Sequence, residues 1–394
     1  MCPGVVRSHA KHTSPVPAPA SRDTDDEVWR RLIVPLRRLR REGRCVRVLR
    51  SPNQPATGGV LANYPLSPMK ILNYLALLLL FTTCSPPPEP PPPSYPAELP
   101  EVPAEPAALG RYVAAREAGQ PLRADNEARI VWADSAAPAR TELAIVYLHG
   151  FGGSYRDGYP VNAAVADSLG ANLYLARWGE HGQTADSALV GFTAAGAWAD
   201  AREALAIGRR LGRRVIVMST STGGTLGLKL AAEFPDDVAA LVNMGPNIED
   251  DMPGAFLLNS PWGMEIAHLV SLGERRRVDQ ETPRAAQYFD TIYPAEALVH
   301  LQQLVGTTMV DSTFARVRCP VLTLYYHRDL LHEDEHVEIS VYPEVHRRFA
   351  TPADHVELLA LPTPETHFIG SDIKSKDTET PRREILRFLR RVMD

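Results

Sequence analysis

The stretch from Val215 to Ala232 constrains the fold of this chain more than any other. Residues 215–218 form a short apolar run with the β-branched content of a buried strand. A turn of small residues follows at once, and residues 225–232 then have the composition of a helix. Only small side chains let a backbone reverse so sharply between a strand and a helix. The stretch therefore predicts a strand, a tight turn and a helix, with a hydroxyl side chain at the apex.

Two serines compete for the apex of this turn. If Ser221 is at the apex, the positions two before and two after it are Ser219 and Gly223, which are both small. If Ser219 is at the apex, the first of these positions is the β-branched Val217. We therefore place Ser221 at the apex, where its hydroxyl would stand above the sheet and beside a helix N-terminus. The alternative is a turn rich in Ser and Thr that carries no chemistry.

Charge is distributed unevenly along the 394 residues. Residues 1–68 carry a net charge of +7, whereas residues 84–394 carry −13. Nucleic-acid binding needs a basic surface, so the acidic part is a poor candidate for it. The four cysteines have no metal-ligand spacing. The sequence therefore predicts no nucleic-acid partner and no structural metal, and catalysis by a serine nucleophile would need no cofactor.

The amino-terminal part of the chain predicts three segments ahead of a folded domain. Residues 1–68 lack sustained periodicity, so we expect a disordered or non-native upstream extension. Residues 69–84 join a lysine to an apolar run that is shorter than the ~20 residues needed to span a bilayer but has the length of a signal segment. Residues 85–106 are dense in proline, as in an extended polyproline spacer.

The segment 69–84 resembles the signal and lipobox of bacterial lipoproteins, because Cys84 follows small residues directly after the apolar run. This resemblance implies a chain anchored to the membrane through lipidated Cys84, in the bacterial cell envelope on its periplasmic or surface side. The spacer 85–106 would then hold the folded domain off the bilayer. An uncleaved short anchor or a buried apolar segment are the alternatives.

Residues 107–394 predict an α/β fold with a mostly parallel central sheet, because apolar runs of strand length alternate with helical patterns. The predicted strands are 129–132, 143–148, 171–176, 215–218, 238–244, 320–326 and 356–361. Helices are predicted at 160–169, at 198–212 and from Thr380 to the end. Residues 247–316 interrupt the alternation with many apolar residues and no clear strand. We expect a helical insertion there, which is either a lid over the site or a peripheral helical pair.

Polar motifs follow several of the predicted strands. His149 and Gly150 follow the first buried strand, an acidic loop follows the penultimate strand, and His367 follows the last one. Ligands of open α/β sheets bind beyond the carboxyl ends of the strands, so these motifs are expected near Ser221. A nucleophilic serine needs a base, an acid that orients the base, and donors for an oxyanion. The chain offers candidates for all of them.

The order of these motifs resembles the α/β-hydrolase superfamily over residues 125–394, in particular the capped serine esterases and monoacylglycerol lipases. The resemblance implies an α/β-hydrolase fold with a helical lid. It also implies that Ser221 is the nucleophile, that His367 is its general base, and that the backbone N–H groups of Phe151 and Thr222 hold the oxyanion. The expected reaction is the hydrolysis of a small ester with an apolar acyl or aryl part, through an acyl-enzyme.

The acid that orients His367 has two candidates. Asp329 lies at the superfamily's usual distance from the strand that opens at Pro320. Counting back from a helix near Pro343 favours Asp334, which begins a run of the usual Asp-x-x-Val form. We favour Asp334, in a loop about five residues longer than usual.

The resemblance implies that His149 and His181 are structural rather than catalytic.

Two other functions are compatible with the same motifs. An aminopeptidase of the proline-iminopeptidase type would need an acidic pocket for a substrate amine, which Glu249, Asp250 and Asp251 could supply. A non-catalytic envelope binding protein on the same fold is the third reading.

Overall fold

The computed structural model of this protein describes residues 92–252 and 254–393. The predicted extension 1–68 and the signal-like segment 69–84, with Cys84, lie outside the described residues. In the described ranges, no helix combines the length and the apolar character that crossing a bilayer requires.

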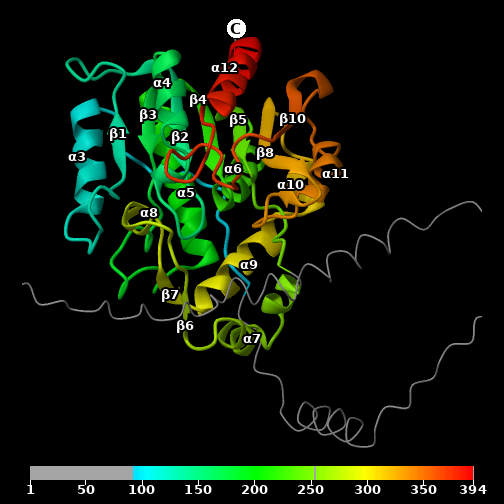
Figure 1. Cartoon of the computed structure of the whole chain (residues 1–394). Coiled ribbons are helices and arrows are strands. Elements are labelled where there is room, and N and C mark those ends of the chain that lie inside the picture. Colours follow the sequence, from blue (N-terminus) through cyan, green and yellow to red (C-terminus); the bar gives the residue numbers. More distant parts are fainter. Residues whose placement is uncertain (1–91, 253, 394) are drawn as a thin grey trace, which may run out of the picture. The chain divides into compact units, whose positions relative to one another are not determined.

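An eight-stranded sheet forms the centre of the described chain, in the order β1-β3-β2-β4-β5-β8-β10 with β9 paired to β8 (Figure 1). The strands are β1 (Arg129–Val131), β2 (Thr141–Leu148), β3 (Asn172–Leu175), β4 (Gly212–Thr220), β5 (Val238–Met244), β8 (Val321–Asp329), β9 (His332–Glu333) and β10 (Val356–Leu361). β1 and β9 pair antiparallel with their neighbours, and the other pairings are parallel. All seven predicted strands are present, and the expected mostly parallel sheet is confirmed.

Helices cover both faces of this sheet. Successive side chains of a strand point to opposite faces, so Val146 packs into one core and the adjacent Tyr147 into the other. The first core lies under α5 and α6, and the second lies under α4 and α12. The helices outside the insertion are α3 (Pro106–Glu117), η1 (Tyr155–Asp157), α4 (Val161–Ser168), α5 (Ala194–Leu211), α6 (Thr222–Glu233), η3 (Ile339–Val341), α11 (Tyr342–His346), η4 (Ala353–His355) and α12 (Glu379–Met393). This three-layer arrangement is that of a doubly wound α/β domain.

The segment 247–316 joins β5 to β8 and is mainly helical, as expected. Its elements are η2 (Ala255–Asn259), α7 (Gly263–Val270), β6 (Arg275–Arg277), α8 (Pro283–Tyr288), β7 (Ile292–Pro294), α9 (Glu296–Thr308) and α10 (Asp311–Phe314). The expectation of no strand here is wrong, because β6 and β7 pair antiparallel in a sheet of their own. Each has only three residues, which is too short to show a period of two in the sequence. Figure 1 shows α7, β6 and β7 at the end of the domain away from α12.

The end of the proline-rich tract lies on the folded domain. Trp198 of α5 donates its indole N–H to the carbonyl of Pro96 over 2.8 Å. The hydroxyls of Tyr95 and Thr307, on α9, share a hydrogen bond of 2.8 Å. Val102 is buried among the helices. The part of the predicted spacer that the structure describes therefore contacts both α5 and the insertion.

Candidate active site

Ser221 occupies the turn between β4 and α6 in a conformation that side chains rarely adopt. Its φ is 55° and its ψ is −121°. A non-glycine residue at positive φ is strained, and such strain is kept where the surrounding structure enforces it, often at functional sites. The backbone N–H of Ser221 donates to the carbonyl of Met244 over 3.1 Å, which ties the turn to β5. The predicted apex residue is thus held in the strained geometry of a nucleophile elbow.

The positions two before and two after Ser221 hold small residues for different structural reasons. A Cβ atom on Gly223 would lie 2.0 Å from the carbonyl oxygen of Leu148, so only glycine fits there. Ser219 is buried, and its hydroxyl donates to the side-chain oxygen of Asn243 over 2.8 Å. A serine can therefore replace the usual glycine at this position, because β5 supplies a partner for its hydroxyl.

His367 and Asp334 form a buried pair. The Nδ1 atom of His367 donates to Oδ2 of Asp334 over 2.7 Å, and the two side chains are 1% and 0% exposed. The other carboxylate oxygen of Asp334 accepts the backbone N–H groups of His336 and Val337. Burial by itself would raise the pKa of Asp334, but the charges of the two histidines and these hydrogen bonds hold that pKa below its usual value. The carboxylate is therefore ionised and fixes the ring of His367.

The second ring nitrogen of His367, Nε2, takes no part in the pair with Asp334. Its Nε2 atom is buried and has no hydrogen-bond partner within the part of the chain that the structure describes. A Cβ atom on Gly245 would lie 3.1 Å from the ring and 3.3 Å from Asp334, so the pair rests on this glycine. Gly245 directly follows Met244, whose carbonyl holds the turn at Ser221. The buried pair thus lies beside the predicted nucleophile, with one ring nitrogen available.

Asp329 lies apart from this pair. β8 continues beyond the core of the sheet and forms a small hairpin with β9, and Asp329 is on that hairpin. Its carboxylate accepts from Nδ1 of His332 over 2.8 Å, and this hydrogen bond chiefly lowers the pKa of Asp329 to about 2. The chain then returns, and the N–H of Asp334 donates to the carbonyl of Tyr326. The structure therefore brings Asp334 to His367 and leaves Asp329 on the surface.

The loop after β2, residues 149–153, which we call the glycine loop, lies against the turn at Ser221. A Cβ atom on Gly150 would lie 3.0 Å from the Cβ of Ser221. Phe151 follows in the same loop, and Thr222 is the first residue of α6. Among the described residues, no partner is found for the backbone N–H of Phe151 or of Thr222. Both N–H groups are therefore free to bind a ligand oxygen.

The two histidines expected to be structural are buried behind this loop. His149 donates from Nδ1 to the carbonyl of Gly150 over 2.8 Å and accepts the N–H of Trp178 at Nε2. Burial lowers the pKa of His149 to about 4. Burial and the neighbouring His149 lower the pKa of His181 as well. Both rings are neutral and have packing and hydrogen-bonding roles.

Asp334, His336 and His367 bring donor atoms within 4.8 Å of one another, which is the arrangement of a candidate metal site. The rings of the two histidines stack with centroids 4.8 Å apart and an angle of 13° between their planes. Lone pairs lie in the plane of an imidazole, so two nearly parallel rings do not direct them to one point. The Nδ1 of His367 is also already bonded to Asp334. The arrangement fits a hydrogen-bonded pair better than a chelate.

The insertion contacts the site from two sides. The N–H of Asp290 donates to the carbonyl of Gly152 over 2.7 Å, and the ring of Tyr293 packs edge-on against Phe151. At its start, the segment 249–251 pairs with residues 336–338, beside Asp334. Asp250 in this segment accepts from Asn247, and burial raises its pKa to about 6. The acidic residues of the aminopeptidase reading are therefore next to the site.

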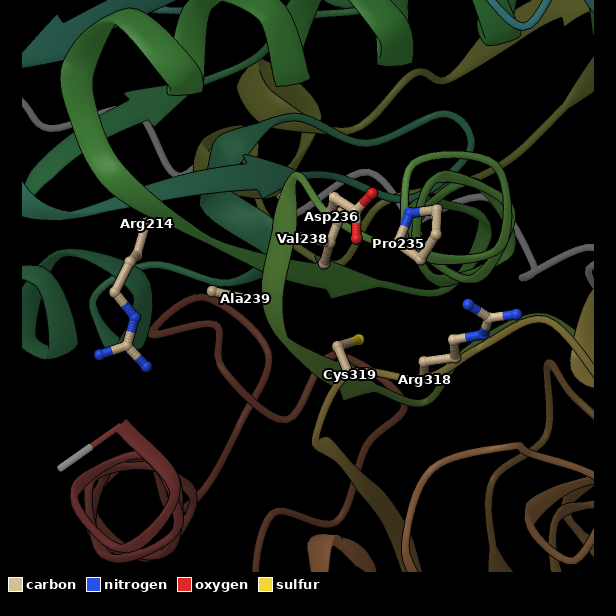
Figure 2. A pocket seen from close by; sticks show the side chains of 7 residues that line it. All are labelled: Arg214, Pro235, Asp236, Val238, Ala239, Arg318 and Cys319. Atoms are coloured by element: carbon tan, nitrogen blue, oxygen red, sulfur yellow. The ribbon is translucent and has the colours of Figure 1, made fainter.

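A recess of about 430 Å³ lies at the other end of the strands (Figure 2). Arg214, Asp236, Arg318 and Cys319 are among the residues that line it. These residues are at the amino ends of β4, β5 and β8, whereas Ser221 follows the carboxyl end of β4. Burial raises the pKa of the Cys319 thiol to about 12, so the thiol is not a nucleophile at neutral pH. This recess is separate from the candidate site.

Two residues of the site were not predicted. Asp157 lies under the glycine loop and accepts the N–H of Gly150 over 2.6 Å. His336 covers one face of the His367 ring. His336 is two residues from a predicted acid, which was a usable signal, because a side chain so close in sequence to a triad member lies near it. Asp157 has no motif around it, and only the fold shows its position.

The fold and this arrangement define an α/β hydrolase. The sequence profile described as the alpha/beta hydrolase family matches residues 145–369, more than half of the chain, and the chain belongs to this family. A comparison with curated proteins found no significant match.

Solved structures similar to this chain include the following three. A structure from the work on LipS and LipT, two metagenome-derived lipolytic enzymes, has a TM-score of 0.56 at 19% identity, over 68% of this chain and 99% of that chain. A soluble variant of monoglyceride lipase from Saccharomyces cerevisiae has a TM-score of 0.47 at 14% identity, over 68% and 91%. Est1E from Butyrivibrio proteoclasticus, with ferulic acid bound, has a TM-score of 0.45 at 16% identity, over 68% and 95%. The first of these likenesses shows that the fold is shared.

Proposed function

We propose that this protein is a serine hydrolase that cleaves carboxylic esters. One observation carries the proposal: a serine in a strained turn lies beside a buried His–Asp pair whose free ring nitrogen has no partner among the described residues. Buried polar atoms are normally hydrogen-bonded, so an unused one beside a strained serine indicates a reactive site. Ser221 is the nucleophile, His367 the general base and Asp334 the acid in this proposal.

The proposed reaction has two acyl-transfer steps. The hydroxyl of Ser221 attacks the ester carbonyl while Nε2 of His367 takes its proton, and Asp334 stabilises the imidazolium. The backbone N–H groups of Phe151 and Thr222 hold the oxyanion of the tetrahedral intermediate. His367 returns the proton to the leaving alcohol. Water, deprotonated by the same histidine, then releases the acid and regenerates Ser221.

The proposed substrate is a small ester with an apolar acyl or aryl part. The insertion acts as a lid in this proposal, which its contacts with Gly152 and Phe151 support. Its aromatic and aliphatic side chains would surround the acyl group, and apolar linings are usual in small-molecule sites. The shared fold of LipS and LipT, which are described as lipolytic, is in line with this substrate class.

Labelling with a fluorophosphonate probe tests the catalytic assignment. The wild-type chain is expected to take up one probe per molecule, and Ser221→Ala is expected to take up none. Esterase activity of Ser221→Ala should fall by about 10⁴-fold or more, because only the oxyanion donors and substrate binding would then contribute to the rate. Wild type that stays unlabelled would refute the proposal and favour a non-catalytic binding protein. Ser221→Ala that still labels would refute Ser221 as the nucleophile.

A pair of substrate series then separates esterase from aminopeptidase. We expect p-nitrophenyl esters to be cleaved with a kcat/KM far above that of aminoacyl anilides. Faster cleavage of the anilides, with loss of that preference in Asp250→Asn, would support the aminopeptidase reading instead. If the esters are the better substrates, Asp250 has a structural role at the start of the insertion.

We propose in addition that the chain is a bacterial lipoprotein anchored through Cys84. The support is the sequence of residues 69–84, with its apolar run ending in a cysteine. Metabolic labelling with a palmitate analogue should mark the wild-type protein and not Cys84→Ala. Label that persists in Cys84→Ala, or no label on wild type, would contradict the anchor.

A further inference from the structure

The short helix η1, Tyr155–Asp157, lies where three segments of the candidate site meet. The glycine loop reaches it through Gly150, whose N–H donates to Asp157. Strand β2 reaches it through Tyr147, whose hydroxyl donates to the same carboxylate and is also hydrogen-bonded to Thr220 at the end of β4. The loop that carries His367 reaches it through Ser371, whose hydroxyl donates to the carbonyl of Arg156 over 2.7 Å. One helical turn is therefore hydrogen-bonded to the glycine loop, to β2 and to the loop that carries His367.

The carboxylate of Asp157 is at the centre of this junction. Its side chain is completely buried. Oδ2 accepts the N–H of Gly150 over 2.6 Å, and Oδ1 accepts the hydroxyl of Tyr147. A Cβ atom on Gly153 would lie 2.9 Å from Oδ2, so the glycine loop wraps closely around the carboxylate. The side chain thus fixes the loop at its start and limits its position near its end.

The same network reaches the nucleophile. The hydroxyls of Tyr147 and Thr220 share a hydrogen bond of 2.7 Å, and Thr220 directly precedes Ser221. The chain of contacts therefore runs from the N–H of Gly150 through Asp157 and Tyr147 to the last residue of β4. The peptide that follows Gly150 carries the N–H of Phe151, one of the two proposed oxyanion donors. The separation between that N–H and Ser221 depends on this network.

We propose that Asp157 is a positioning residue, which holds the N–H of Phe151 at the distance from Ser221 that an oxyanion needs. This inference rests on the proposed function, because it assigns a role within the same reaction. The carboxylate does not touch the reacting atoms. It acts through the peptide of Gly150, and a shift of about 1 Å in such a donor can cost about 100-fold in rate.

The burial of Asp157 is costly, and this supports a specific role for it. Desolvation raises its pKa to about 7, although Tyr147, Gly150 and the nearby His367 each act to lower that pKa. A neutral apolar residue of similar size would avoid this desolvation cost. It would also leave the N–H of Gly150 without an acceptor, so the loop would have to move to find one.

The experiment measures kcat and KM for a p-nitrophenyl ester with the full chain and three variants. Asp157→Ala removes both acceptor atoms. Asp157→Asn keeps an oxygen for Gly150 and offers an amide N–H to the oxygen of Tyr147, whose hydroxyl can then donate to Thr220. Asp200→Ala is the matched control, because that partly buried carboxylate also accepts a backbone N–H, from Gly179 over 2.7 Å. Titration with the fluorophosphonate probe gives the concentration of competent sites in each preparation.

Asp157→Ala is expected to lower kcat per titrated site by about 10- to 100-fold with KM within about threefold of wild type. Asp157→Asn should recover kcat to within about fivefold of wild type, since its hydrogen bonds keep the loop in place. Asp200→Ala should keep kcat per site unchanged. A purely structural role for Asp157 would reduce the number of competent sites and leave kcat per site intact.

Two results would overturn the inference: kcat per site of Asp157→Ala within about threefold of wild type, or Asp157→Asn as impaired as Asp157→Ala. If Asp157→Ala does not fold, Tyr147→Phe provides the second variant, because it removes the hydroxyl that joins Asp157 to Thr220 and leaves the bond between Asp157 and Gly150 in place. We expect it to lower kcat per site by about 3- to 10-fold, and an unchanged value would contradict the network. Failure of wild type to label would instead count against the proposed function, before any variant is compared.

Discussion

Two aspartates that lie close together in sequence near the end of β8, Asp329 and Asp334, each pair with a histidine, and the two bond lengths are nearly the same. His367 donates from Nδ1 to Asp334 over 2.7 Å, and His332 donates from Nδ1 to Asp329 over 2.8 Å. Their surroundings differ completely. The side chains of the first pair are 1% and 0% exposed, whereas those of the second are 48% and 51% exposed.

This difference decides which pair can orient a catalytic base. Water screens the exposed pair, and two mobile surface side chains gain little by holding one geometry. The buried pair is not screened, and packing and backbone N–H groups hold both side chains in place. Only this pair rests on Gly245, next to the turn of Ser221. A short Asp–His distance is therefore weak evidence for a triad until burial and position are added.

The largest effect that tests this contrast is expected for Asp334→Asn. An asparagine can turn its amide N–H toward Nδ1 of His367 and so stabilise the tautomer that cannot accept the proton of Ser221 at Nε2. We expect kcat for a p-nitrophenyl ester at pH 8 to fall by about 10³- to 10⁴-fold, with a much smaller change in KM.

The control for Asp334→Asn is the number of sites that a fluorophosphonate labels at long exposure. The nucleophile and the oxyanion donors are unchanged, so labelling should become slow but reach the same final level. A kcat within about tenfold of wild type would show that Asp334 does not orient the base.

A second prediction concerns Asp157, a buried carboxylate without a bonded histidine. Burial raises its pKa to about 7, whereas the pKa of Asp334 is held below its usual value by its histidines. The sign of the stability effect follows from linkage. A raised folded-state pKa gives a contribution that is complete below the unfolded pKa, about 4, and that is lost as the pH rises through about 7.

Asp157→Asn should abolish this pH-dependent loss of stability, because an asparagine side chain does not ionise. Between pH 4 and pH 8, we expect the free energy of unfolding of wild type to fall relative to that of Asp157→Asn by about 2–4 kcal/mol. Urea unfolding of both proteins at several pH values measures the difference. The groups that face Asp157 are Tyr147 and His367, so the comparison should be repeated in a His367→Ala background. Parallel stability curves for the two proteins would mean that Asp157 is already ionised at pH 4.

The central strands could be predicted from the sequence because β2, β3, β4, β5 and β8 each contain an apolar run buried on both faces. The turn at Ser221 could be placed because the close approach of Leu148 permits only glycine at position 223. The members of the proposed triad could be proposed because each follows a strand at the same edge of the sheet. The strands, the turn and the proposed triad residues each leave a pattern in a few adjacent residues, because packing in the fold restricts which side chains fit there.

The choice of acid could not be made with the same certainty from sequence. Asp329 has the sequence position at which a shorter loop would carry the acid, but β8 extends into a hairpin with β9 and leaves Asp329 on the surface. The three-residue strands β6 and β7 and the position of Asp157 also escape prediction. Each depends on contacts between segments that are distant in sequence, and none of them leaves a periodic pattern.

The smallest expected effect belongs to Asp329→Asn. The exposed carboxylate has a lowered pKa because of its hydrogen bond with His332, but solvent screens this interaction and neither side chain reaches Ser221 or His367 in the described structure. We expect kcat to stay within about twofold of wild type and the melting temperature within about 2 °C. Measured beside Asp334→Asn under identical conditions, this variant isolates the contribution of burial, because both changes remove one carboxylate from a bonded histidine. A loss of kcat in Asp329→Asn that approached the loss in Asp334→Asn would mean that the hairpin of β8 and β9 folds over the site during the reaction.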